Sequence, residues 1–174
     1  MRRVACALVV LCSATACAFQ QRPDAGVTFV VVRHAEKATD DPRDPSLSTA
    51  GTVRAHALAQ LLHSPPVSAA YATRFRRTRL TAAPIAHAAG IRVTTYDADL
   101  PVDAFVRQLR ETHADGAVLV VGHSNTVPLI AAGLGVAAKP IPDCAYDRML
   151  VVTLGTRPSA IASRYGAPSE NCPG

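Results

Sequence analysis

The chain has 174 residues, of which 49% are apolar and 5% aromatic, and its formal net charge is +5 at pH 7. This length corresponds to one domain, and the apolar content is high enough to build a sizeable core. We find no internal repeat, no heptad run and no second domain boundary, which excludes repeat and coiled-coil architectures. Because Trp is absent and Ala and Val abound, the core should be aliphatic. The positive charge suits anionic substrates.

The N-terminus predicts export. A basic pair, Arg2 and Arg3, precedes the apolar run 4–11, and small residues follow at positions 13–16. This order is typical of a secretory signal, and the apolar run is too short to span a bilayer. We therefore expect residues 1–16 to be a signal peptide.

Two kinds of cleavage fit the segment before Cys17. Ordinary signal peptidase would cut after the small residues Ala14 and Ala16, whereas lipoprotein processing would leave Cys17 as an acylated first residue. Either cut leaves residues 17–26 as a polar leader and residues 27–174 as the folded domain. We expect a periplasmic protein, or a lipoprotein that contacts the membrane only through a lipid on Cys17.

After the leader, strand and helix patterns alternate. Continuous apolar runs rich in β-branched residues, such as V-T-F-V-V-V at 27–32, are typical of strands that are buried on both faces. We expect strands at residues 27–32, 67–72, 91–96, 117–121, 149–154 and, as an edge strand, 160–165. Helices are expected to start after Ser48, near Phe75 or Arg76, at Pro101 and at Thr126.

This alternation predicts a three-layer α/β sandwich with a mostly parallel sheet and helices on both faces. The first helix is expected to turn Ala50, Val53, Ala57 and Leu61 toward the core, with Leu58 and Leu62 beside them. In such sheets, ligands bind at the carboxyl ends of the strands. The residues that follow each strand are therefore the candidates for function.

Charged and polar side chains follow three of the predicted strands. Arg33 and His34 come after the first, the basic segment 74–79 after the second, and His123 after the fourth. A neutral imidazole can attack phosphorus, and guanidinium groups can bind phosphoryl oxygens bidentately. A second, protonated histidine could donate to the same oxygens. This set of residue types favours phosphoryl-group chemistry.

The same segments resemble the histidine phosphatase superfamily, which has the phosphoglycerate mutase-like fold. The similar motifs are V-V-R-H-A-E-K, A-T-R-F-R-R-T-R-L-T-A and V-V-G-H-S-N-T, in that order along nearly the whole mature chain. The resemblance implies that His34 is the nucleophile, that Arg33 and Arg77 bind phosphate, and that His123 completes the pocket. Arg77 is chosen because the R-T-x-x-T-A that it begins fits the family pattern.

The chain departs from the family pattern in two ways. Ala35 stands where the family usually has glycine, which is a mild change. No carboxylic acid matches the family's proton donor decisively. Asp97 is our first candidate for this acid, with Asp99 and Glu36 as alternatives. Asp99 could equally cap the following helix, and Glu36 could pair with a neighbouring cation.

We therefore expect hydrolysis of phosphorylated small molecules, specifically phosphomonoesters, through a phosphohistidine and without a metal or organic cofactor. A phosphohistidine-protein phosphatase stays open, because a nitrogen leaving group needs no strong acid. So does a non-catalytic phosphate-binding lipoprotein. A mutase is disfavoured, because no insertion is long enough to form a lid.

Two other classes fit the residues poorly. A metal site built from His34, His123 and Glu36 lacks both an H-E-x-x-H motif and a Cys or His cluster. The basic segment 74–79 is short and has only Phe75 as an interleaved aromatic, so we expect no nucleic-acid binding.

The cysteines agree with export. Cys6 and Cys12 lie in the expected signal peptide, so if Cys17 carries lipid, Cys144 and Cys172 remain as one possible disulfide pair. Two free thiols are the alternative. The bridge would stabilise the fold by roughly 3 kcal/mol. We expect its reduction to lower thermal stability without abolishing catalysis, because neither cysteine belongs to the expected pocket.

Overall fold

The computed structural model describes residues 26–64, 66–99, 101–169 and 172. Residues 1–25, which include the expected signal peptide and Cys17, lie outside this part of the chain. In chain order the described elements are β1 (Thr28–Arg33), α1 (Thr49–Leu61), β2 (Ala69–Thr73), α2 (Arg76–Ala88), β3 (Val93–Tyr96), α3 (Val102–Thr112), β4 (Ala117–Gly122), α4 (Val127–Gly133), β5 (Arg148–Thr153) and β6 (Ser159–Arg164).

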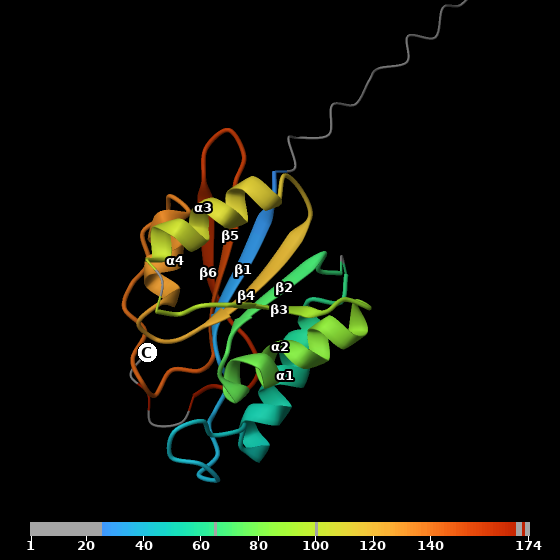
Figure 1. Ribbon diagram of the computed structural model, residues 1–174, viewed down its shortest axis with the longest axis vertical. Helices are drawn as coiled ribbons and strands as arrows, with labels where there is room; N and C mark the ends of the chain where they lie inside the picture. Colours follow the sequence, from blue (N-terminus) through green and yellow to red (C-terminus); the bar gives the residue numbers. More distant parts are fainter. Residues whose placement is uncertain (1–25, 65, 100, 170–171, 173–174) are drawn as a thin grey trace, which may run out of the picture.

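The strands form one sheet in the order β3-β2-β4-β1-β5-β6 (Figure 1). Strands β3, β2, β4 and β1 run parallel, because each is joined to the next in sequence by a crossover helix. Strand β5 pairs antiparallel with β1, and β6 continues the sheet as an antiparallel edge strand. The predicted α/β fold with a mostly parallel sheet is confirmed.

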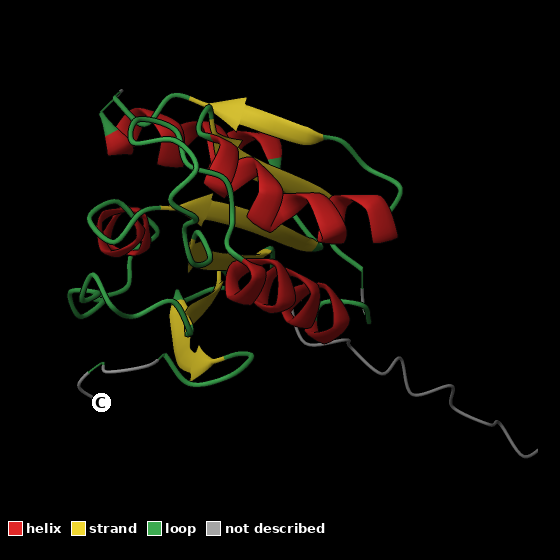
Figure 2. Ribbon diagram, turned by 90° about the horizontal axis from the view of Figure 1, so that it is seen from below, coloured by secondary structure: helices red, strands yellow, loops and turns green. Residues whose placement is uncertain are grey.

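The central strand β1 has apolar side chains on both faces, as its continuous apolar run predicts. Phe29 and Val31 belong to a core with α3 and α4, whereas Val30 and Val32 belong to a core with α1 and α2. The helices therefore cover the sheet on both sides and make three layers (Figure 2). None of the helices in the described ranges is long and apolar enough to cross a bilayer.

The expected buried face of α1 was wrong. Val53 is 65% exposed and Leu61 52% exposed, whereas Leu58, expected beside that face, is buried together with Gly51, Arg54 and Ala55. A side-chain carbon at Gly51 would clash with the backbone of Glu36, so the glycine allows a close approach of helix and loop. The charge of Arg54 is tolerated in this face because the carboxylate of Glu36 pairs with it.

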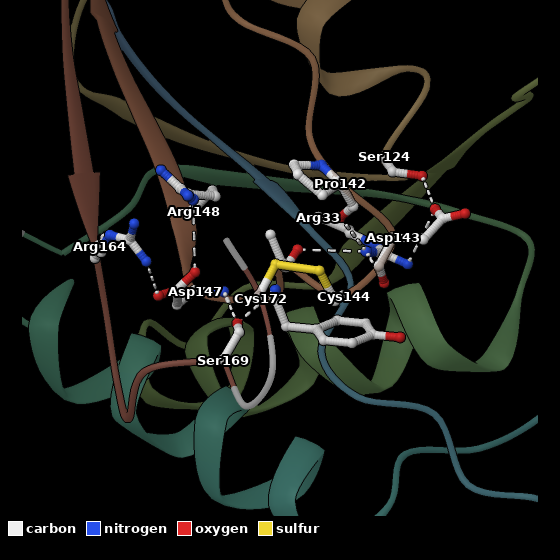
Figure 3. The surroundings of a disulfide bond; sticks show 12 residues. Arg33, Ser124, Pro142, Asp143, Cys144, Asp147, Arg148, Arg164, Ser169 and Cys172 are labelled. Atoms are coloured by element: carbon white, nitrogen blue, oxygen red, sulfur yellow. Dashed lines mark hydrogen bonds and ion pairs between the residues drawn. A yellow bond between two sulfur atoms is a disulfide. The ribbon is translucent and has the colours of Figure 1, made fainter. Parts of the chain in front are cut away.

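A disulfide joins Cys144 to Cys172, 28 residues apart in sequence, with their Cα atoms 5.3 Å apart (Figure 3). This confirms the predicted pairing and excludes two free thiols in this structure. The bridge fastens the C-terminal segment to the irregular segment between α4 and β5, because Cys144 lies in that segment.

Candidate active site

The register of two parallel strands brings the two predicted histidines together. Arg33 is paired with Gly122 at the carboxyl ends of β1 and β4. The N–H of His34 then donates to the carbonyl of Gly122 at 2.9 Å, so His34 and His123 each follow the last paired residue. Their ring centroids are 5.4 Å apart. The strand-end rule thus placed both imidazoles at the same edge of the sheet.

His34 is held with one ring nitrogen unprotonated. The side chain is buried, and Nδ1 lies 2.8 Å from the carbonyl oxygen of Ala35. Because a carbonyl oxygen only accepts, Nδ1 carries the proton and Nε2 keeps its lone pair. Burial, with the positive charges of Arg33 and Arg77 nearby, lowers the pKa of His34 to about 3. The imidazole is therefore neutral at pH 7.

The turn after His34 is fastened to α2 by a single hydroxyl. The N–H of Ala35 donates to Oγ1 of Thr81 at 2.9 Å, and that hydroxyl donates to the carbonyl oxygen of Arg77 at 2.7 Å. Thr81 therefore links the turn that follows His34 to the helix that carries Arg77. This contact explains why the spacing R-T-x-x-T-A accompanies the site.

Arg33 is buried and oriented by one loop. Its Nη1 donates to the carbonyl oxygens of Pro142, Asp143 and Ala145 at 3.1, 2.6 and 3.3 Å. Its guanidinium lies over the ring of Tyr146, 4.2 Å from the ring centroid. Its Nε is buried and has no hydrogen-bond partner within the described residues. Its Nη2 lies 3.7 Å from the exposed carboxylate of Asp143. The Nε–Nη2 edge could bind an anion bidentately if the anion took the place of that carboxylate.

Arg77 has a similar arrangement in the first turn of α2. Its side chain is 15% exposed and lies over the ring of Phe75, 4.2 Å from the ring centroid. Its Nε is also buried without a hydrogen-bond partner in the described part of the chain. The nearest carboxylate, that of Asp44, is 4.0 Å from Nη1. The amino-terminal end of α2 adds partial positive charge at the same place.

His123 is neutral at pH 7, not protonated as the sequence led us to expect. Its pKa is lowered to about 4, first by burial and then by the charges of Arg77 and Arg33. Its Nε2 lies 3.1 Å from Oγ1 of Thr73, which is 2.8 Å from Oγ1 of Thr78. Nδ1 is therefore the ring nitrogen that remains for a ligand. The two arginines already supply the positive charge, and burial disfavours a third cation.

The other arginines of the basic segment lie on the surface. Arg74 is 60% exposed and pairs with exposed carboxylates, as does the exposed Arg76. Arg79 is exposed as well. The structure therefore separates Arg77 from its three neighbours, in agreement with the choice made from its motif.

The two aspartates considered as proton donors are exposed and bound to one arginine. Nη1 of Arg74 is 2.9 Å from Asp99 and 3.7 Å from Asp97. The N–H of Asp99 donates to the carboxylate of Asp97 at 2.9 Å, which closes the turn after β3. No side chain caps α3, so Asp99 does not have the alternative role of a helix cap.

Glu36 has a structural partner. The buried Arg54 donates to it from Nε at 2.9 Å and from Nη2 at 2.7 Å, and also donates to the carbonyl oxygen of Tyr165 at 2.8 Å. This is the pairing with a cation that we considered, but with α1 rather than a near neighbour. Glu36 is thus engaged away from His34 and His123, and no group of three metal-ligand side chains occurs within the described ranges.

The sequence did not identify Tyr146, Phe75 and the loop carbonyls as parts of the site. Phe75 lies inside the basic segment 74–79, so its position next to the arginines could have identified it as a residue of the site. Tyr146 follows Arg33 by 113 positions in the printed sequence and belongs to no recognisable spacing. Only the folded chain places its ring beneath the guanidinium.

Comparison with known proteins agrees with this geometry. Residues 29–100 match the family model of the histidine phosphatase superfamily (branch 1). The matched segment runs from β1 through the turn after β3 and includes His34, Arg33 and Arg77. No curated protein sequence matches the chain closely enough to count as a relative.

Solved structures share the fold at low sequence identity. A protein assigned as phosphohistidine phosphatase SixA from Nakamurella multipartitia is 24% identical, with a TM-score of 0.61 over 84% of this chain and 99% of that one. The protein histidine phosphatase SixA in complex with tungstate is 20% identical, with a TM-score of 0.59 over 79% and 96%. A mycobacterial glucosyl-3-phosphoglycerate phosphatase is 16% identical, with a TM-score of 0.58 over 76% and 96%. Residues 29–100 therefore match the histidine phosphatase superfamily, and the described chain has the fold that these solved structures share.

Proposed function

We propose that this protein hydrolyses phosphomonoesters through a phosphohistidine formed on His34. One observation carries the proposal. A neutral imidazole with an unprotonated Nε2 lies beside two arginines whose buried Nε–H groups have no partner within the described residues. Buried N–H groups are nearly always hydrogen-bonded, so Arg33 and Arg77 indicate an anion at this place. A phosphoryl group next to Nε2 would satisfy both.

The reaction has two displacements at phosphorus. In the first, Nε2 of His34 attacks, the N–P bond forms, and the bond from phosphorus to the leaving oxygen breaks. In the second, water attacks phosphorus, the N–P bond breaks, and inorganic phosphate leaves with His34 neutral again. Arg33 and Arg77 donate to the phosphoryl oxygens in both steps and offset the charge that spreads over them. His123 donates an N–H to the same oxygens.

The leaving alkoxide must gain a proton in the first step. We propose Asp97 as the donor, because it lies at the turn after β3, on the same edge of the sheet as the histidines. Asp99 is the alternative within the same turn. Both carboxylates would have to exchange their contact with Arg74 for the substrate.

A second candidate is hydrolysis of phosphohistidine in a protein or peptide. The observation that favours it is the state of the carboxylates: Asp97 and Asp99 are bound by Arg74, and Glu36 by Arg54. A protonated imidazole is a good leaving group, so this substrate does not require a strong acid from the enzyme. The similarity of the fold to SixA phosphatases is consistent with this candidate.

We also propose that the protein works outside the cytoplasm. The signal-like N-terminus and the disulfide between Cys144 and Cys172 support an oxidising compartment. Cys17 would be the lipid attachment site if lipoprotein processing occurs. The physiological substrate would then be a phosphorylated compound of that compartment.

Labelling tests the proposed chemistry. The wild type incubated with a ³²P-labelled phosphomonoester and quenched in base should carry acid-labile, base-stable label, whereas His34→Ala should carry none. Turnover of a phosphomonoester panel and of a phosphohistidine peptide, with and without chelator, would discriminate between the two candidates. Label that persists in His34→Ala would refute the assignment of the nucleophile.

A further inference from the structure

The loop that orients Arg33 contains a disulfide cysteine. Three carbonyl oxygens of this loop accept from Nη1, and Cys144 stands between two of the residues that provide them, Asp143 and Ala145. Figure 3 shows Arg33 and the bridge from Cys144 to Cys172 close to this loop. The same backbone segment therefore contacts Arg33 and carries one end of the bridge.

The loop has little regular structure to hold it in place. Residues 138–147 contain no helix or strand, and their local contact is a turn in which Ala145 N–H donates to the carbonyl of Pro142. Two side chains contact the ends of the loop: Oγ of Ser124 donates to Asp143 at 2.8 Å, and Nη1 of Arg164 donates to Asp147 at 2.7 Å. Oγ of Ser169 accepts from the N–H groups of Tyr146 and Asp147 at 2.8 and 3.2 Å, close to the bridge. The C-terminal segment is therefore one of the supports of the loop.

Bidentate binding depends on the direction of the guanidinium as well as on its charge. Nη1 is fixed by the loop carbonyls and the plane lies on Tyr146, so the Nε–Nη2 edge has one orientation. A shift of the loop carries its carbonyls and Tyr146 with it. Arg33 would then keep its charge but lose the alignment of its two donors, which is costly in a catalytic site.

We propose that the Cys144–Cys172 disulfide positions Arg33 for phosphate binding, which makes both cysteines positioning residues of the active site. The inference rests on the proposed function, because it concerns the same phosphate site. It adds an effect on phosphate binding to our expectation from the sequence, which was that reduction lowers thermal stability without abolishing catalysis. The sulfur atoms do not touch the phosphate; they act through the loop carbonyls.

Reduction is the direct perturbation. A small dithiol such as dithiothreitol gives two electrons and two protons to the bridge, the S–S bond breaks, two thiols form, and the dithiol becomes a cyclic disulfide. Binding of inorganic phosphate to the mature protein, measured by calorimetry, should weaken by about tenfold or more on reduction. Reoxidation should restore it. The double variant Cys144→Ser/Cys172→Ser should match the reduced wild type, and in both the KM of a phosphomonoester should rise.

Reduction of the disulfide in the Arg33→Ala variant tests whether the bridge acts by orienting Arg33 or by loosening the whole site. If the bridge acts through this arginine, reduction should leave the phosphate affinity of Arg33→Ala unchanged, since the guanidinium is already gone. Leu109→Ala is the matched control. This substitution removes most of a buried side chain of α3, on the other face of the sheet from α1 and α2. It should lower thermal stability and leave phosphate affinity the same.

Three results would overturn the inference. Phosphate affinity that is unchanged on reduction, with a lower melting temperature, would show a purely stabilising bridge. An equal effect of reduction in Arg33→Ala would show that another group carries it. Loss of the far-UV circular dichroism signal on reduction would show that the bridge holds the whole fold. Failure of the proposed function looks different: no form of the protein would turn over phosphate esters or phosphohistidine.

Discussion

Replacement of Arg77 by alanine tests the phosphate site most directly. The side chain is 15% exposed and its Nε is buried without a partner in the described chain, so it should donate to the substrate in a partly dry environment. Loss of such a charge-assisted donor costs roughly 3 kcal/mol of transition-state stabilisation, or about a hundredfold in kcat/KM. Arg77→Lys should recover little, because an ammonium group keeps the charge but cannot bind bidentately.

The same segment supplies matched controls. Arg76→Ala and Arg79→Ala each remove one positive charge within two residues of Arg77, but from exposed side chains whose fields are screened by solvent. We expect kcat/KM to change by less than about threefold in either variant. Steady-state kinetics on one phosphomonoester at constant ionic strength compares the wild type with all four variants. Equal losses at the three positions would refute the reasoning and show that the segment acts as a diffuse positive field.

Four further outcomes are expected. Asp97→Asn should lower kcat for esters of poor leaving groups by about a hundredfold and leave phosphohistidine peptides unaffected; equal effects on both would reject it as the acid. Glu36→Gln should lower the free energy of unfolding in urea by roughly 3 kcal/mol, because Arg54 loses its buried partner. The pKa of His34 is about 3 in the folded chain and about 6.5 when unfolded, so the unfolded state gains its proton first. Stability should therefore fall as pH drops from 6.5 toward 3, and less steeply in His34→Asn. Cys17→Ser should move the protein from the membrane fraction to the soluble exported fraction if Cys17 is acylated.

The fold was predictable because its signals are local. The buried strands are continuous apolar runs of the length of a strand, and the helices between them begin and end at recognisable residues. The face of α1 was not predictable from periodicity. Arg54 is buried because Glu36, 18 positions earlier, meets it after the chain turns back. The sequence of a helix cannot predict that one of its charged residues is buried when the residue that pairs with it lies in another segment.

The positions of the candidate site residues were predictable for a related reason. His34, His123 and Arg33 follow or end buried parallel strands, and the parallel register aligns those ends. The surroundings that tune them were not. The neutrality of His123 depends on burial and on two nearby arginines, and the orientation of Arg33 depends on a loop 109 to 112 positions away. Such properties arise from distant segments that meet only in the folded chain.

The charges that we propose for substrate binding also act on the proposed nucleophile. Arginine keeps its proton at any physiological pH, so Arg33 and Arg77 give the pocket a fixed positive potential. That potential attracts a phosphoryl dianion. Burial, and then this potential, lowers the pKa values of His34 and His123 to about 3 and 4, so both rings are neutral at physiological pH. An arriving dianion opposes their field and raises the pKa of His123, so its capacity to hold a proton increases only once the phosphoryl group is bound.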